Sequence, residues 1–158
     1  MTGAFGRRTG TEAGHIGLTL WAITAVLLVG TALDYGILWI GQRQDTLTWE
    51  YVAIVNTVEG MGSLIVALAL AYAAFYVSGR RSVAVERALA GLVMMVGVFG
   101  GALGFLLIMD YLALRSTMEP TAAELFTTTT VKGMTLSGLY FFVLVPIGLR
   151  GLLRAGKE

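Results

Sequence analysis

The sequence predicts an all-α integral membrane protein in which four transmembrane helices form one antiparallel bundle. Of its 158 residues, 56% are hydrophobic and 13% are charged, and the mean hydropathy is +0.78. Soluble domains carry about 25% charged residues, so this chain has too few charges for a surface that faces water. Its apolar stretches exceed the ~20 residues that cross a bilayer. They cover residues 16–40, 51–77, 85–114 and 122–149, so we expect a single transmembrane domain over 1–158.

Short polar connections between the stretches carry helix start and stop signals. Asp45 and Thr48 are candidate N-caps for the second helix, and Ser78-Gly79 is a candidate stop for it. Ser82 is a candidate N-cap for the third helix. Thr121 and Glu124, three residues apart after Pro120, predict a capping box at the start of the fourth.

Residues 1–32 also allow a second interpretation, a secretory signal. Arg7 and Arg8 precede an apolar run, and small residues follow near Gly30. The apolar run continues past Asp34 to Ile40, which is too long for a signal core. We therefore expect the first stretch to remain in the protein as a transmembrane helix.

Lysine and arginine bias in short loops predicts the orientation. One side of the membrane would hold eight basic residues and the other only Arg43 and Arg115. The eight are Arg7, Arg8, Arg80, Arg81, Arg87, Arg150, Arg154 and Lys157. Both termini are therefore expected in the cytoplasm, with Trp39, Trp49 and Tyr51 at the outer interface, where amphipathic rings settle.

Composition excludes several functional classes. No cysteine is present, which excludes thiol redox chemistry and thiolate metal sites, and His15 is the single histidine. A net charge of +1 without a basic stripe gives no sign of nucleic-acid binding. We find no nucleophile–base pair, no metal-ligand set and no cofactor motif. We therefore expect no catalytic residues, no metal and no cofactor, and an intramembrane enzyme acting on a lipid or quinone has the least support.

One charged residue lies inside each apolar stretch: Asp34, Glu59, Asp110 and Lys132. Such charges cost about 2.5–3.5 kcal/mol each on insertion scales, and they usually pair or face a functional cavity. At 1.5 Å per residue, Glu59 and Lys132 lie ~12–15 Å inside the outer ends of their helices. We therefore expect a Glu59–Lys132 ion pair in the outer half of the membrane. Such a pair can serve to fix helix register alone.

Lys132 neutralises only one carboxylate, which leaves Asp34 and Asp110. Asn56, Glu59 and Ser63 share one helix face. We expect an acidic pocket that accepts protons or a small cation, formed by Glu59, Asp34, Asp110, Lys132 and Asn56 beside Tyr35, Tyr111, Thr31 and residues 127–130. The alternative for Asp34 and Asp110 is snorkelling to the interface from near the helix ends.

A weak internal similarity raises the hypothesis of a duplicated two-helix hairpin. Asp34-Tyr35 recurs as Asp110-Tyr111, and the pentapeptide at 57–61 (TVEGM) resembles that at 130–134 (TVKGM). Both similarities occur in the same order and at corresponding depths, so the two halves of the chain would share one orientation.

Glycines at positions 97, 100, 101 and 104 have the small-xxx-small spacing that brings membrane helices together, either within the bundle or between copies. Two functions remain from the sequence. The first is a small protein that handles protons or a cation through the acidic pocket. The alternative is a non-catalytic subunit of a larger respiratory or other energy-converting membrane complex. Partners would be the bilayer and either further copies of the chain or other membrane subunits.

Overall fold

Four long helices and no strand make up the part of the chain that the computed structural model describes, which is residues 5–39, 46–78 and 82–155. The helices are α1 (Phe5–Trp39), α2 (Leu47–Val77), α3 (Val83–Arg115) and α4 (Pro120–Arg154). Each contains a segment long and apolar enough to cross a membrane. The predicted all-α membrane fold with four spanning helices is therefore confirmed.

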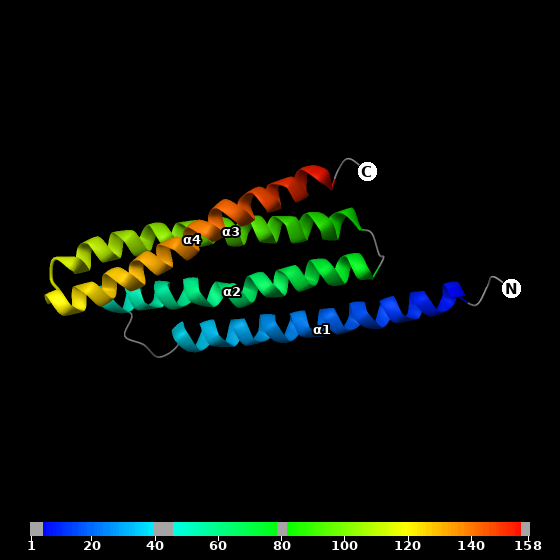
Figure 1. Ribbon diagram of the computed structural model, residues 1–158, viewed down its shortest axis with the longest axis horizontal. Coiled ribbons are helices and arrows are strands. Elements are labelled where there is room, and N and C mark those ends of the chain that lie inside the picture. The colour runs from blue at the N-terminus through cyan, green and yellow to red at the C-terminus, as the bar shows by residue number, and fades with distance from the viewer. Residues whose placement is uncertain (1–4, 40–45, 79–81, 156–158) are drawn as a thin grey trace.

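The helices run alternately up and down, as Figure 1 shows. The start of α1 and the end of α4 lie at one end of the bundle, which we call the terminal end. The turn at residues 116–119 lies at the opposite end, which we call the turn end. This alternation follows from short connections, because a short loop brings the next helix back beside the previous one.

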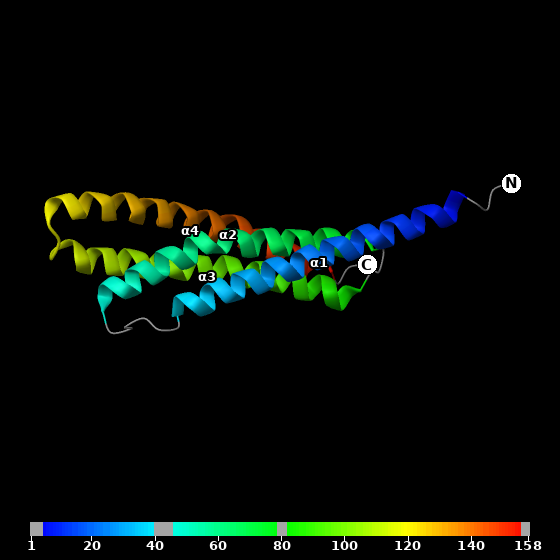
Figure 2. The same ribbon diagram turned by 90° about the horizontal axis from the view of Figure 1, so that it is seen from below.

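Helix α2 organises the packing. It contacts the other three helices, and α3 and α4 form the most extensive pair. Helix α1 packs only against α2 in the described residues, so α2, α3 and α4 form a three-helix core with α1 added at one side (Figures 1 and 2). The main core cluster lies nearer the turn end and includes Val58 and Met61 of α2 and Leu107 of α3.

Several helix ends differ from those expected. Helix α1 begins well before Ile16, because the hydropathy pattern marks the part of a helix that suits the bilayer and not where the helix starts in water. The N-cap of α2 is Thr46, whose hydroxyl accepts a hydrogen bond from the Trp49 backbone N–H at 3.3 Å. Thr48 is therefore inside the first turn, and Asp45 lies outside the described residues.

At the end of α2 the expected stop is confirmed at Ser78, which is the C-cap and whose hydroxyl donates to the Ala74 carbonyl. Gly79, the second residue of that predicted stop, lies outside the described residues. Ser82 occupies the N-cap position of α3 in an extended conformation but makes no side-chain capping bond. The predicted capping box of α4 is wrong. The N-cap is Glu119, and Pro120 opens the first turn, a position where its missing N–H has no helical partner to lose.

The glycines of α3 are confirmed as packing positions within the bundle. A Cβ on Gly97 would lie 2.9 Å from Val145 Cγ2, and one on Gly104 would lie 2.6 Å from Ser137 Cβ. Gly148 of α4 lies against the backbone of α3. A Cβ added at this position would be 2.6 Å from the Met94 backbone nitrogen. This glycine was not identified from the sequence. Glycines on both helices therefore allow α3 and α4 to approach closely.

Candidate functional site

The predicted ion pair between α2 and α4 is confirmed. Lys132 Nζ donates a hydrogen bond to Glu59 Oε1 at 2.6 Å. The two side chains remain 63% and 40% exposed, so the pair lies on the surface of the bundle rather than in its core. In a membrane this surface faces lipid or a neighbouring molecule.

A polar cavity of about 230 Å³ lies between α1 and α2, and it contains two of the residues that the sequence predicted for the site, Asp34 and Asn56. The full lining is Thr31, Asp34, Tyr35, Asn56, Gly60 and Ser63. On α1 these residues recur at i, i+3 and i+4, and on α2 at i, i+4 and i+7. Both spacings place side chains on a single helix face.

Tyr35 of α1 forms a hydrogen bond to α2 at this cavity. Its hydroxyl donates to the Thr57 backbone carbonyl at 3.0 Å. Gly60 allows this approach, because a Cβ at position 60 would lie 3.3 Å from the Tyr35 hydroxyl oxygen. The close contact of α1 with α2 at this level thus depends on a small residue opposite a large one.

The ion pair is not part of the cavity lining, although Glu59 belongs to the same stretch of α2 as the lining residues. Glu59 directly precedes Gly60, and it lies within one helical turn of Asn56 and Ser63. Asn56, Glu59 and Ser63 are all exposed, which agrees with the shared polar face expected from their spacing. Asp34 is exposed as well. Asp34 and Asn56 therefore share the cavity, whereas Glu59 and Lys132 form an ion pair outside its lining.

Asp110 does not line the α1–α2 cavity. It is 7% exposed, on the same face of α3 as the core residues Leu107 and Leu114, and its Oδ2 has no hydrogen-bond partner in the described residues. Snorkelling to the interface is therefore wrong for Asp110. Of the three acidic residues expected in one pocket, only Asp34 lines the cavity.

Two of the four threonines at residues 127–130 bond to tyrosines of the three-helix core. The Tyr51 hydroxyl lies 2.8 Å from Thr130 Oγ1 and donates to the Phe126 carbonyl at 3.1 Å. Tyr111 bonds to Thr127 at 2.7 Å. The expectation that Tyr51 anchors at the interface is wrong, because its ring is 3% exposed and packs on Phe126. The run of four threonines at residues 127–130 was the sequence feature that could have predicted these bonds.

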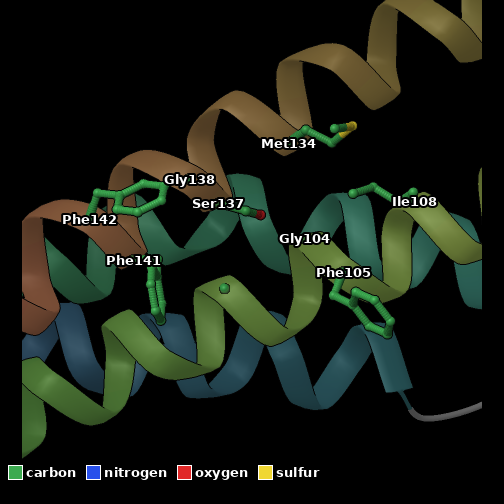
Figure 3. A pocket seen from close by; sticks show the side chains of 9 residues that line it. Gly104, Phe105, Ile108, Met134, Ser137, Gly138, Phe141 and Phe142 are labelled. Carbon is green, nitrogen blue, oxygen red and sulfur yellow. The ribbon is translucent and has the colours of Figure 1, made fainter.

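A second, apolar cavity of about 310 Å³ lies between α3 and α4 (Figure 3). Phe105, Phe141, Phe142 and Met134 form its walls, and glycines form part of its floor. Ser137 is its single hydroxyl. This oxygen is buried without a partner in the described residues, and it lies 3.1 Å from where a Gly104 Cβ would be. Without a charged group this cavity suits lipid chains and gives no ion site.

Where the chain is described, no three or more histidine, cysteine or carboxylate side chains lie close enough together to hold a metal ion. Several basic residues used for the orientation lie outside that part: Arg43, Arg80, Arg81 and Lys157, together with the side chains of Arg7 and Arg8. Comparisons with protein-family models, with curated proteins and with solved structures found no match to this chain.

Proposed function

We propose that this protein binds and moves protons or a small cation through the polar cavity between α1 and α2. One observation supports the proposal. The cavity is lined by a carboxylate, an amide and three hydroxyls, and it lies between two helices that are long and apolar enough to cross a bilayer. Polar groups are costly at that depth, and in membrane proteins they usually mark ion or substrate paths. Asp34 and Asn56 would contact the ion.

Glu59 and Lys132 would act beside the cavity as an internal counter-charge pair. Their contact at 2.6 Å neutralises both charges and leaves Asp34 as the uncompensated charge of the region. Asp110 would be a second carboxyl for proton handling, away from the cavity. A buried oxygen without a partner is costly to keep, which supports a functional role for it.

Both termini lie in the cytoplasm in this proposal, because eight of the eleven basic residues belong to that side by sequence. Figure 1 agrees in one respect, since α1 begins and α4 ends at the same end of the bundle. The cavity would then belong to the outer half of the membrane.

The test is flux in liposomes that contain the purified chain. Wild-type protein should carry protons or an alkali cation across the bilayer above the protein-free rate. The variants Asp34→Asn and Glu59→Gln should lose at least about tenfold in rate while they still insert, because a positioned charge contributes several kcal/mol to ion binding. Glu119→Gln, an exposed acid at the turn end, is the matched control. Equal flux in Asp34→Asn and wild type would contradict the proposal.

The second candidate function is a non-catalytic subunit of a larger energy-converting membrane complex. The exposure of Lys132 and Glu59 favours it, because a charged pair on the lipid-facing surface gains from a neighbouring chain that covers it. In this candidate the neighbour is a different subunit of the complex. The test is to extract the protein from its native membrane in mild detergent and to identify the proteins that co-purify with it. Stoichiometric redox or photosynthetic subunits would support the candidate, and a lone chain or homo-oligomer would reject it.

A further inference from the structure

The three hydroxyl groups that line the α1–α2 cavity each donate a hydrogen bond to a backbone carbonyl. Thr31 Oγ1 donates to the Leu27 carbonyl at 2.8 Å, and Tyr35 donates to the Thr57 carbonyl at 3.0 Å. Ser63 Oγ donates to the Gly60 carbonyl at 2.7 Å. A hydroxyl has one proton and two lone pairs. Each of the three therefore has only lone pairs left for a ligand.

The remaining polar groups extend this pattern. An ionised Asp34 carboxylate only accepts hydrogen bonds, and the Asn56 amide has a carbonyl oxygen to present. Five groups of the cavity thus offer acceptor oxygens, and only one of them, the Asn56 amide, still has protons to donate. Such a lining repels anions. It suits a hard cation, which prefers carboxylate, carbonyl and hydroxyl oxygens.

The charge of the lining and the volume of the cavity indicate which class of cation fits. Asp34 is the one ionisable carboxylate in the lining, and the adjacent Glu59 is neutralised by Lys132. A monovalent ion makes this region neutral, whereas a divalent ion leaves a positive charge in a medium of low dielectric constant. The cavity volume of about 230 Å³ exceeds that of a bare ion, since one water occupies ~30 Å³. The ion would keep several waters.

We infer that the cavity lined by Thr31, Asp34, Tyr35, Asn56 and Ser63 is a binding site for a partly hydrated alkali-metal cation. This inference rests on the proposed function and specifies its ligand, a cation rather than a bare proton. Thr31 and Ser63 bind through lone pairs that their bonds to helix carbonyls leave free, and Asp34 supplies the charge.

Thermal unfolding of the full chain in detergent tests the site directly. The melting temperature is measured in sodium, potassium or lithium chloride from 1 to about 100 mM, with choline chloride keeping the ionic strength constant. At least one alkali cation should raise the melting temperature by about 2–4 °C relative to choline, because a ligand that binds only the folded state stabilises it. Calcium and magnesium chloride are the divalent probes.

Two variants and one matched control locate the binding. Thr31→Val keeps the shape of the side chain but removes its oxygen, so the cation-dependent rise should fall by more than half. Asp34→Asn should abolish it. Thr24→Val is the control, because Thr24 is also buried on α1 and also donates to a backbone carbonyl, that of Leu20 at 2.9 Å, but lies outside the cavity. It should keep the full rise.

Three outcomes would overturn the inference: no difference between alkali cations and choline, a larger rise with divalent ions, or a rise that persists in Asp34→Asn. The flux assay separates these from failure of the proposed function. Proton flux that depends on Asp34, without any alkali-cation effect, would retain ion handling and reject the cation site. Cation-dependent melting without any flux would retain the site and reject transport.

Discussion

Lys132 and Glu59 each bring a charge into helix segments that are otherwise apolar enough to cross a membrane. Their contact at 2.6 Å links α2 to α4 beside a cavity that links α2 to α1. A pair in this position can fix helix register and also set the charge of the neighbouring site. The two roles predict different results when charges are removed or exchanged.

Removal of one partner should destabilise the fold. Glu59→Gln or Lys132→Met leaves the other charge uncompensated in the membrane, at a cost of about 2.5–3.5 kcal/mol on insertion scales. The exchanged double variant Glu59→Lys with Lys132→Glu should regain most of that loss. Unfolding in detergent–denaturant mixtures measures both effects, and Arg154→Met, an exposed basic residue near the end of α4, is the control. Single variants as stable as wild type would show that the pair contributes nothing.

Ion flux through the exchanged variant distinguishes a pair that only fixes helix register from a pair that also sets the charge beside the cavity. If the pair only fixes register, the exchanged variant should restore flux together with stability. If Glu59 must stand next to the cavity, the exchanged variant should be stable but inactive, because position 59 would then carry a positive charge beside Asp34.

At the scale of elements, the contact of α3 with α4 depends on glycines that face the partner helix. Gly104 meets Ser137, and Gly148 meets the backbone of Met94 and Ala90. Backbone atoms cannot rotate away as a side chain can, so position 148 has the least room for an added methyl group. The sequence identified the α3 glycines by their spacing, whereas Gly148 follows Pro146 in a segment without that spacing.

Gly148→Ala should therefore destabilise the bundle by about 1–3 kcal/mol, the usual cost of overpacking. Gly138→Ala on the same helix is the matched control. No atom lies within 4 Å of where its Cβ would be, so it should be neutral or slightly stabilising through helix propensity. Melting temperatures in one detergent compare the two, and equal values would contradict the packing described for position 148.

The hypothesis of a duplicated hairpin also belongs to this scale, and it stays a hypothesis. In each half the tyrosine after the aspartate bonds to a threonine of the following helix, Tyr35 to the Thr57 carbonyl and Tyr111 to the Thr127 hydroxyl. The two halves differ in the aspartates themselves, because Asp34 is exposed and Asp110 is buried.

For the molecule as a whole, the main feature is that α1 packs on α2 alone in the described residues (Figure 1). The α1–α2 cavity consequently lies at one side of the three-helix core, and the ion pair between α2 and α4 lies on the surface of the bundle. This placement suits an ion path along α1 and an interface equally well.

Orientation gives a prediction for the whole molecule. The sequence has no cysteine, so single cysteines can be introduced without background. Ser116→Cys at the turn end should react with a membrane-impermeant maleimide in intact cells, because the basic residues place the opposite end inside. Arg154→Cys near the terminal end should react only after lysis. The reverse pattern would place the termini outside, and the cavity would then open toward the cytoplasm.

The sequence by itself determined that the chain forms four membrane-spanning helices, because length and apolar composition are sufficient for a segment that must satisfy its backbone hydrogen bonds within lipid. It also determined the Glu59–Lys132 pair, since two opposite charges in apolar helices at similar depth strongly favour each other. Only the tertiary structure decided that Asp34 lines a cavity with Asn56 while Asp110 is buried elsewhere. The reason is physical: spacing along one helix sets which residues share a face, but the rotation of each helix against its neighbours, fixed by contacts such as Gly60 with Tyr35, sets which faces meet.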